Sequence, residues 1–407
     1  MADSDAKVFT NKDGQKIDAE IQSKSADKVV LKLLKNDKVY TISIATLVEG
    51  DQKFINEWKS EEEEKERDKE DIKPEAGTSD DGGASYEYGH FFYSNIKKKY
   101  ELEDNFDAEW PKMTSTDIPE IEIVKEDDET KVYVYQSENY EFVCDVRLSK
   151  NVVKKFSHLF EATRDYCKAI PISMMKAHLP DGKYKYKILL FENEKTYFKN
   201  GGPSGSAGVY MSGKDVIMVP LTSLGVKKVG SGYMFDYDGS NKTLPHEITH
   251  QLTNLEYYNA GARGWFSEGL AEYIAMTDYR SGKYMIRSNL KDIRDAVTGF
   301  AKKSGRGRNI GTEIKAPDLK QFMNMTYGEF TANGNFNYGL GTLVTYYFLH
   351  MDGDEKRKNV NAFLMALNEG KKGDEVIKLL LNGRSYDELE VDIYKAWKSK
   401  GVEINFK

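Results

Sequence analysis

The chain has 407 residues and a formal net charge of −7, of which −6 falls between residues 59 and 81, where eleven acidic residues face five basic ones. The remainder is close to neutral, which argues against attraction to nucleic acid or to an anionic membrane by overall charge. No run approaches the roughly 18 apolar residues that would cross a bilayer, so we expect no membrane span. The length predicts about two or three domains.

Residues 7–58 have the pattern of a small β-rich unit, because short alternating segments are separated by Lys-Asp-Gly, Ser-Ala-Asp and Lys-Asn-Asp turns and followed by a short helix over 48–59. The stretches "FTNKDGQKIDAEI" (9–21) and "ISIATLVEGDQKFINEW" (42–58) resemble the Sla-type homology domain, a small SH3-like barrel. The resemblance implies a binding or spacing module at 1–58, whose partner is unknown. A plain folded appendage is the alternative.

Residues 59–85 are charged at first and then rich in Gly, Ser and Asp, which predicts an acidic flexible linker. Beyond it the patterns predict strands over 131–146 and 184–194, a helix over 151–170 and a hairpin over 207–221. Helical spacing follows at 266–277, 286–303, 338–351, 357–370, 373–382 and 386–399. Strands followed by helices predict an α+β fold, with a catalytic subdomain over 86–277 and a helical subdomain over 278–407.

Two of only six histidines lie four residues apart in "HEITHQLTN" (246–254). On a helix with Pro245 in its first turn and Thr243 as its cap, His246 and His250 share one face and can bind one tetrahedral Zn²⁺. Glu247 lies about 100° around the helix from His246, where it can take a proton from a water that zinc has made acidic. The pattern therefore predicts a zinc cofactor with Glu247 as the catalytic base.

A catalytic zinc needs a third protein ligand, and the segment "GWFSEGLAEY" (264–273) offers Glu268. Glu272 lies one turn later on the same helical face, where it can accept the second ring N–H of a zinc-binding histidine, His246 being the favoured one. Glu256 is a rival ligand, but its position at or just beyond the end of the histidine helix disfavours it.

The His-Glu-x-x-His pattern followed by "WFSEGLAEY" resembles the gluzincin metallopeptidases, whose aminopeptidase-type motif Trp-x-x-Glu-Gly-x-Ala is matched by Trp265, Glu268, Gly269 and Ala271. The wider stretch 130–350 resembles the peptidase-MA-like group of bacterial proteins. The resemblance implies a zincin-like fold and a peptide or protein substrate. No "Gly-Ala-Met-Glu-Asn" sequence is present to anchor a free amino terminus, so an endopeptidase is favoured.

Gluzincins present an edge strand to an extended peptide, and the hairpin that precedes the histidines can supply it through Gly208, Val209, Tyr210 and Met211, or through its second segment "VIMVP". Related enzymes use a downstream tyrosine or histidine to hold the oxyanion, and Tyr338 matches that position best. The basic segment "KKSGRGRN" (302–309) is interpreted as a mobile surface loop, with substrate contact as the alternative.

The sequence thus predicts a zinc-dependent peptidase. A non-catalytic binding or adhesion protein on a gluzincin scaffold is the main rival, and a cytoplasmic hydrolase of non-peptide substrates is another. The first residues show no signal peptide; we expect an exported protein, periplasmic or secreted, whose leader is absent from this chain, with the cytoplasm as the alternative. Cys144 and Cys167 are interpreted as two buried thiols, with one disulfide as the alternative.

Overall fold

The structure is a computed structural model that describes residues 6–12, 14–24, 28–33, 35, 38–57, 77–78, 84–88, 91–95, 102–203, 206–236, 244–299, 307–353 and 357–407. It is a mixed α+β protein, as predicted, with two units, Met1–Ala76 and Gly77–Lys407. The two predicted subdomains 86–277 and 278–407 therefore belong to one unit. Within the described ranges, no helix combines the length and the apolar character needed to cross a bilayer.

The smaller unit is a curled antiparallel sheet of four strands in the order β1-β2-β3-β4, followed by one helix. Its elements are β1 (Ala6–Thr10), β2 (Lys16–Lys24), β3 (Lys28–Leu33), β4 (Val39–Ser43), η1 (Ile44–Thr46) and α1 (Glu49–Glu57). The core is formed by Phe9, Ala19, Ile21, Val29, Leu31, Ile44, Leu47 and Ile55. Buried Asp51 of α1 accepts the Thr10 amide at 2.6 Å and lies 2.9 Å from the Lys7 ammonium, so it fixes the helix against β1.

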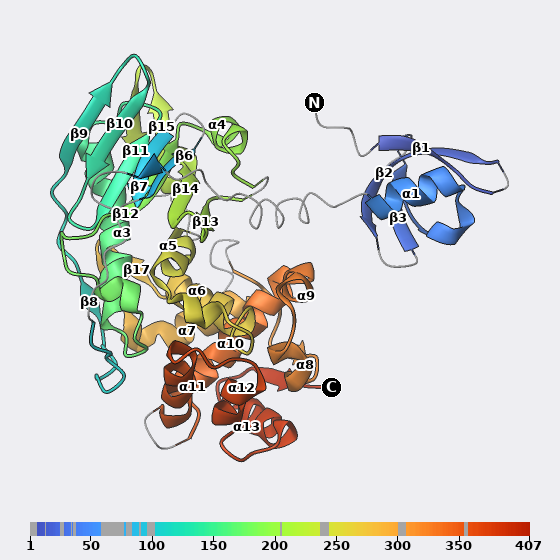
Figure 1. The fold of residues 1–407 in the computed structure, drawn as a ribbon. Helices are drawn as coiled ribbons and strands as arrows, with labels where there is room; N and C mark the ends of the chain where they lie inside the picture. Colours follow the sequence, from blue (N-terminus) through green and yellow to red (C-terminus); the bar gives the residue numbers. More distant parts are fainter. Residues whose placement is uncertain are drawn as a thin grey trace. The chain divides into compact units, whose positions relative to one another are not determined.

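The larger unit is built on a six-stranded sheet with the order β13-β14-β12-β11-β10-β9 (Figure 1). The strands are β9 (Glu122–Asp127), β10 (Val132–Gln136), β11 (Tyr140–Cys144), β12 (Tyr186–Phe191), β13 (Val209–Met211) and β14 (Val216–Pro220). The three central strands, β11, β12 and β14, are parallel, and β13 runs antiparallel to β14. The predicted hairpin is therefore present, and its first strand is an edge of the sheet.

Side chains alternate between the two faces of this sheet, as the twofold period of a strand requires. On β14, Ile217 and Val219 belong to the core that the long helix α3 (Lys150–Ala169) covers, whereas Val216 and Met218 pack on the other face with Tyr197 of α4 (Glu194–Lys199). Because both faces are covered, all five residues of β14 are buried. A strand of this kind is a firm support for the edge strand β13 beside it.

The helices that follow the sheet gather on one side of the larger unit, in its lower half in Figure 1. They are α5 (Leu244–Leu252), η5 (Leu255–Tyr258), α6 (Trp265–Met276), α7 (Asn289–Thr298), α8 (Leu319–Met323), α9 (Tyr327–Ala332), α10 (Gly334–His350), α11 (Lys358–Asn368), α12 (Asp374–Leu381) and α13 (Tyr386–Lys398). The predicted helices are confirmed apart from the end of 286–303, part of which lies outside the described residues, and the sequence missed the short helices α8 and α9.

The remaining short elements connect these parts. They are β5 (Gly77–Thr78), β6 (Ala84–Tyr88), β7 (Phe91–Asn95), β8 (Thr114–Ser115), η2 (Met175–His178), η3 (Leu221–Leu224), β15 (Val226–Val229), β16 (Gly232–Phe235), β17 (Tyr279–Arg280), β18 (Lys283–Tyr284), η6 (Ile286–Ser288), β19 (Glu313–Lys315) and β20 (Glu403–Asn405). The strand β5 and the start of β6 fall within the range predicted as linker, of which 59–76 and 79–83 lie outside the described residues.

Two glycines allow α6 and α10 to pack closely. A Cβ atom added at Gly269 of α6 would lie 2.5 Å from the carbonyl oxygen of Gly341 and 2.4 Å from Oγ1 of Thr345, both on α10. A Cβ atom at Gly341 would lie 2.9 Å from the carbonyl oxygen of Trp265. The backbones of the two helices are therefore close enough to exclude any larger residue at these two positions.

Candidate metal centre

The helix α5 presents the two histidines of the centre. Pro245 stands in its first turn, where the missing N–H breaks no helical hydrogen bond, and the predicted cap Thr243 lies outside the described residues. His246 and His250 follow one turn apart, both buried, with their Nε2 atoms 2.9 Å from each other. The predicted placement of both rings on one helical face is confirmed.

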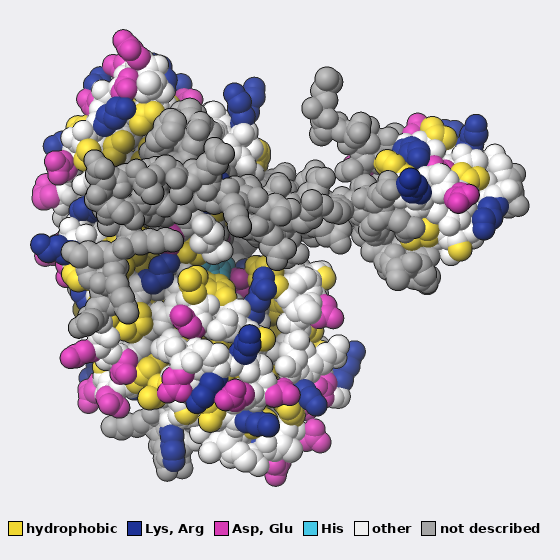
Figure 2. Space-filling view, in the orientation of Figure 1, with side chains coloured by type: hydrophobic (Ala, Val, Ile, Leu, Met, Phe, Trp, Pro, Cys, Tyr) yellow, Lys and Arg dark blue, Asp and Glu magenta, His cyan; other side chains and the backbone are white. Residues whose placement is uncertain are grey.

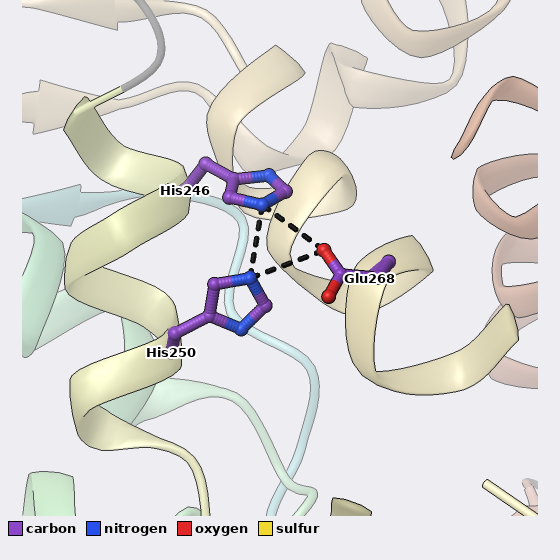
Figure 3. A group of neighbouring side chains, drawn as sticks. All are labelled: His246, His250 and Glu268. Atoms are coloured by element: carbon purple, nitrogen blue, oxygen red, sulfur yellow. Dashed lines mark hydrogen bonds and ion pairs between the residues drawn. The ribbon is translucent and has the colours of Figure 1, made fainter. Parts of the chain in front are cut away.

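The helix α6 brings a carboxylate to the same point. Oε2 of Glu268 lies 3.2 Å from Nε2 of His246 and 3.1 Å from Nε2 of His250, so the three residues predicted as ligands converge (Figure 3). All three are buried and together could hold a metal ion. Glu256, the rival ligand, is on η5 and is not a member of this group.

The geometry of the three atoms fits a zinc site. Tetrahedral bonds of about 2.0–2.1 Å would place neighbouring ligand atoms about 3.3 Å apart, slightly more than the separations observed here. The Nδ1 atom of His246 lies 3.0 Å from Oε1 of Glu272, and an ionised carboxylate can only accept, so a neutral ring would carry its proton on this nitrogen. The Nε2 lone pair of His246 then points at His250 and Glu268. When both rings are neutral, three acceptors therefore face one another, and either a proton on Nε2 or a bound cation satisfies them.

The His250 imidazole and the Glu268 carboxylate also each have a partner that fixes their orientation. The hydroxyl of Tyr258 lies 2.9 Å from Nδ1 of His250 and donates its own hydrogen to the His250 carbonyl oxygen at 3.2 Å, so it accepts from the imidazole. The hydroxyl of Tyr327, at the start of α9, donates to Oε1 of Glu268 at 3.2 Å. This bond leaves Oε2 as the carboxylate oxygen directed at the histidines. Outer partners of this kind set tautomer and orientation in metal sites.

The charges around the centre favour a cation. Although burial alone lowers the pKa of His246, contacts with Glu268 and Glu272 raise it well above its usual value. Burial likewise opposes ionisation of Glu268, but His250 and His246 hold the pKa of that carboxyl well below its usual range. The glutamates therefore stabilise positive charge at the rings, and positive charge at the rings stabilises the ionised Glu268 carboxylate.

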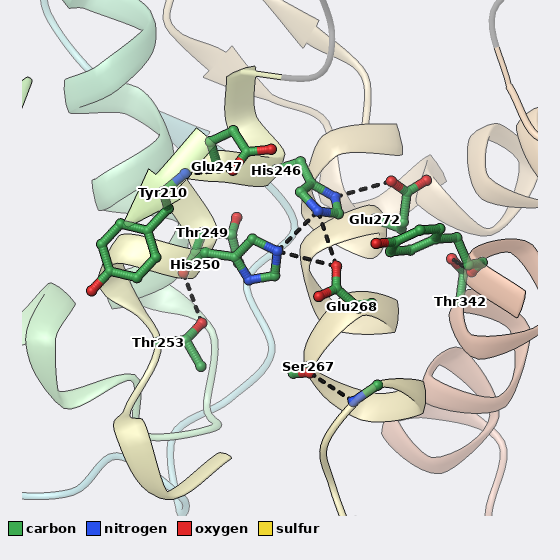
Figure 4. Close-up of polar contacts among 12 residues, drawn as sticks. Tyr210, His246, Glu247, Thr249, His250, Thr253, Ser267, Glu268, Glu272 and Thr342 are labelled. Carbon is green, nitrogen blue, oxygen red and sulfur yellow. Dashed lines mark hydrogen bonds and ion pairs between the residues drawn. The ribbon is translucent and has the colours of Figure 1, made fainter. Parts of the chain in front are cut away.

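Glu247 lies beside the three converging atoms and is not one of them. Its Oε2 atom accepts the backbone N–H of Tyr210 on β13 at 2.9 Å, so the edge strand and the predicted base are in direct contact (Figure 4). Burial raises the pKa of Glu247, and the histidines partly oppose that rise. A carboxylate with a raised pKa is a better proton acceptor than an exposed glutamate. Tyr210 is one of the four predicted substrate-binding residues, and Gly208, Val209 and Met211 adjoin it.

Tyr338 lies on α10, with its ring centroid 6.0 Å from that of His246. It is half-buried, and burial raises the pKa of its hydroxyl, so the group is a neutral donor at physiological pH. The guanidinium of Arg308 stands over the Tyr338 ring, 4.6 Å from its centroid. Arg308 also binds the Glu272 carboxylate with two hydrogen bonds, from Nε at 3.0 Å and from Nη2 at 2.6 Å.

Three residues of the centre, Tyr258, Tyr327 and Arg308, were not predicted from the sequence. Tyr258 and Tyr327 are two of 26 tyrosines and stand outside any recognisable pattern. The interpretation of 302–309 as a mobile surface loop is wrong for Arg308, which is half-buried and paired with Glu272; residues 302–306 lie outside the described residues. The only signal in the sequence for Arg308 was the cluster of basic residues around it.

The other groups considered from the sequence lie away from the centre. Cys144 and Cys167 are free and buried, as the favoured interpretation predicted. His158 is buried, with Nε2 2.8 Å from the carbonyl oxygen of Thr116, and His350 ends α10, with Nε2 3.0 Å from the Tyr273 hydroxyl. Figure 2 shows a small area of histidine surface on one face of the larger unit.

Comparison of the sequence with protein-family models and with curated proteins finds no match. The gluzincin and SH3-like resemblances therefore stay predictions that rest on the motifs and on the geometry described above.

Proposed function

We propose that the larger unit is a zinc-dependent peptidase with a zincin-like fold, of the gluzincin type. The observation that carries the proposal is the convergence of Nε2 of His246, Nε2 of His250 and Oε2 of Glu268 at separations of 2.9 to 3.2 Å. Two imidazoles and one carboxylate, with a fourth position left for water or substrate, are the ligand set of catalytic rather than structural zinc. The smaller unit is proposed to be an SH3-like binding or spacing module.

The charge of the groups around the three ligand atoms supports a divalent ion at this point. With the histidines neutral, as they are when they bind a metal, Glu247, Glu268 and Glu272 contribute three negative charges and Arg308 one positive charge. A dipositive cation brings this set to neutrality, and a buried charge without compensation is costly. When bound, zinc supplies a Lewis acid for the peptide carbonyl and lowers the pKa of water to about 7.

Glu247 is proposed as the general base that takes the proton from the attacking water and passes it to the leaving amine. It is not one of the three proposed metal ligands, but it lies in the same turn of α5 as His246. A purely structural metal site would not need a carboxylate at this position. The contact of Glu247 with the Tyr210 amide fixes the carboxylate beside the edge strand. Retention of this glutamate argues against the rival of an inert binding protein.

The edge strand β13 is proposed to bind the substrate. Its neighbour β14 occupies only one of its sides, and the Tyr210 amide on the other side is directed at Glu247. An extended peptide paired with this second side of β13 would lie along the base and the metal ligands. Main-chain pairing gives affinity without selecting a particular sequence, which suits a peptidase.

Tyr338 is proposed as the donor that holds the oxyanion formed when the carbonyl is attacked. Its ring faces that of His246 from a different helix, and its hydroxyl stays protonated. A single oxyanion donor contributes about 10²–10³ in rate. Tyr327, the other nearby hydroxyl, is already engaged by Glu268 and is assigned to ligand orientation instead.

The test combines metal analysis of the purified full chain with cleavage of a peptide library. Wild type and Glu247→Gln should each hold about one zinc, since glutamine can still accept the Tyr210 amide, and the variant should cleave at least a hundredfold more slowly. Glu268→Gln should lose zinc, whereas Glu256→Gln, at the rival position, should keep it. A wild type that holds zinc and cleaves no library peptide would favour the binding protein over the peptidase.

A further inference from the structure

Arg308 has contacts that the proposed chemistry has not used so far. Its guanidinium grips both oxygens of Glu272, and Oε1 of that carboxylate also lies 3.0 Å from Nδ1 of His246. The same guanidinium stands over the ring of Tyr338. One side chain therefore touches both the residue that orients a metal ligand and the residue proposed to hold the oxyanion.

The backbone of Arg308 is fixed by two hydrogen bonds. Its amide donates to the carbonyl oxygen of Ala296 on α7 at 2.9 Å, and its own carbonyl oxygen accepts Nδ2 of Asn335 on α10 at 2.8 Å. Gly307 has a φ of 136°, and a Cβ atom there would lie 2.2 Å from the Ala296 carbonyl oxygen. Only glycine fits this approach, so the turn that delivers Arg308 depends on the residue before it.

We propose that Arg308 is a positioning residue of the metal centre, an inference that rests on the proposed function. It acts on His246 through Glu272 and on Tyr338 by stacking. Without the guanidinium, the buried Glu272 carboxylate would be free to rotate towards the cation. Two hydrogen bonds from a planar fork prevent this rotation, and the positive charge cancels that of Glu272.

The geometry requires arginine rather than any cation. Lysine offers a single ammonium point charge, whereas the guanidinium plane binds a carboxylate at two points and stacks on an aromatic ring with its face. The Glu272 side chain is 7% exposed and that of Arg308 is 25% exposed, so the pair is shielded from water on the carboxylate side. A charge-conserving change to lysine should therefore restore only part of the function.

The experiment measures zinc affinity of the full chain by competition with a chelator, which needs no assay of cleavage. Arg308→Gln should lower the affinity about 10–100-fold, the usual effect of losing an outer partner of a metal ligand. Arg308→Lys should recover part of the loss. The control is Arg294→Gln on α7, whose guanidinium binds Asp295 and not the centre, and whose affinity should equal that of wild type.

Two further readouts separate positioning from a general effect on folding. If Arg308 acts through Glu272, the double variant Arg308→Gln/Glu272→Gln should lose no more affinity than Glu272→Gln alone. The visible absorption of the Co²⁺-substituted protein should shift in Arg308→Gln and stay unchanged in Arg294→Gln. Equal zinc affinity and equal Co²⁺ spectra in wild type and Arg308→Gln overturn the inference, as does a wild type without metal. Zinc binding without peptide cleavage would refute the peptidase alone.

Discussion

Zinc added to the metal-free protein should raise the melting temperature of the larger unit by about 6 °C. At a free zinc concentration a thousand times the Kd, binding to the folded state alone adds about 4.1 kcal/mol. Unfolding entropy is about 2.1 cal/mol/K per residue, so the roughly 330 residues of 77–407 give about 0.7 kcal/mol/K, and the ratio of the two is about 6 °C. The increase arises because the ion neutralises buried carboxylates that the unfolded chain exposes to water.

Tryptophan fluorescence suits this measurement. Three of the four tryptophans, Trp110, Trp265 and Trp397, belong to the larger unit, and the last two are fully buried. The double variant His246→Ala/His250→Ala should melt at the same temperature with and without zinc, whereas Glu247→Gln should keep the full increase. The same increase in the double variant would show that the ion binds elsewhere, and no increase in the wild type would show that it does not bind. Either result would refute the assignment of the centre.

Further variants test single contacts. Tyr258→Phe removes the acceptor for the His250 ring N–H and should weaken zinc binding about 10–100-fold in a chelator competition; unchanged affinity would mean that this hydroxyl does not orient the imidazole. Tyr338→Phe should lower kcat about 10²–10³-fold at unchanged zinc affinity, and an unchanged kcat would remove Tyr338 from the mechanism. Burial raises the pKa of Asp145 to about 6, so its ionisation opposes folding increasingly from about pH 4 and fully above pH 6. Asp145→Asn should therefore raise the melting temperature at pH 7 and not at pH 4; an equal effect at both values would contradict the burial argument.

The parts of the centre that the sequence could predict lie within single helical turns. His246 and His250 are four residues apart, as are Glu268 and Glu272, so helical geometry alone places each pair on one face. The pairing of Glu272 with His246 joins two helices; it was predicted on the condition that Glu268 binds the metal, and it agrees with the 3.0 Å contact. Local spacing is a reliable guide wherever the interacting groups share an element.

The parts that could not be predicted join segments far apart in the chain. Tyr327 meets Glu268 across 59 residues and Arg308 meets Glu272 across 36, and neither contact leaves a periodic signal. Tyr327 also begins α9, a six-residue helix too short to be detected by its periodicity. Such contacts depend on how the helices pack, which a single sequence does not encode in local spacing.

The helix α6 presents metal-binding side chains on one side and packs against α10 on the other. This explains why a glycine, Gly269, follows the proposed ligand Glu268. Glu268 and Glu272 are directed at the histidines of α5, whereas Gly269 is packed against Gly341 of α10. The close approach of α6 and α10 puts Tyr338, one turn before Gly341, within reach of His246. The sequence Glu-Gly thus specifies a metal ligand and, through the absence of a side chain, the position of the hydroxyl opposite it. Chemistry and packing are therefore set by adjacent residues of one helix.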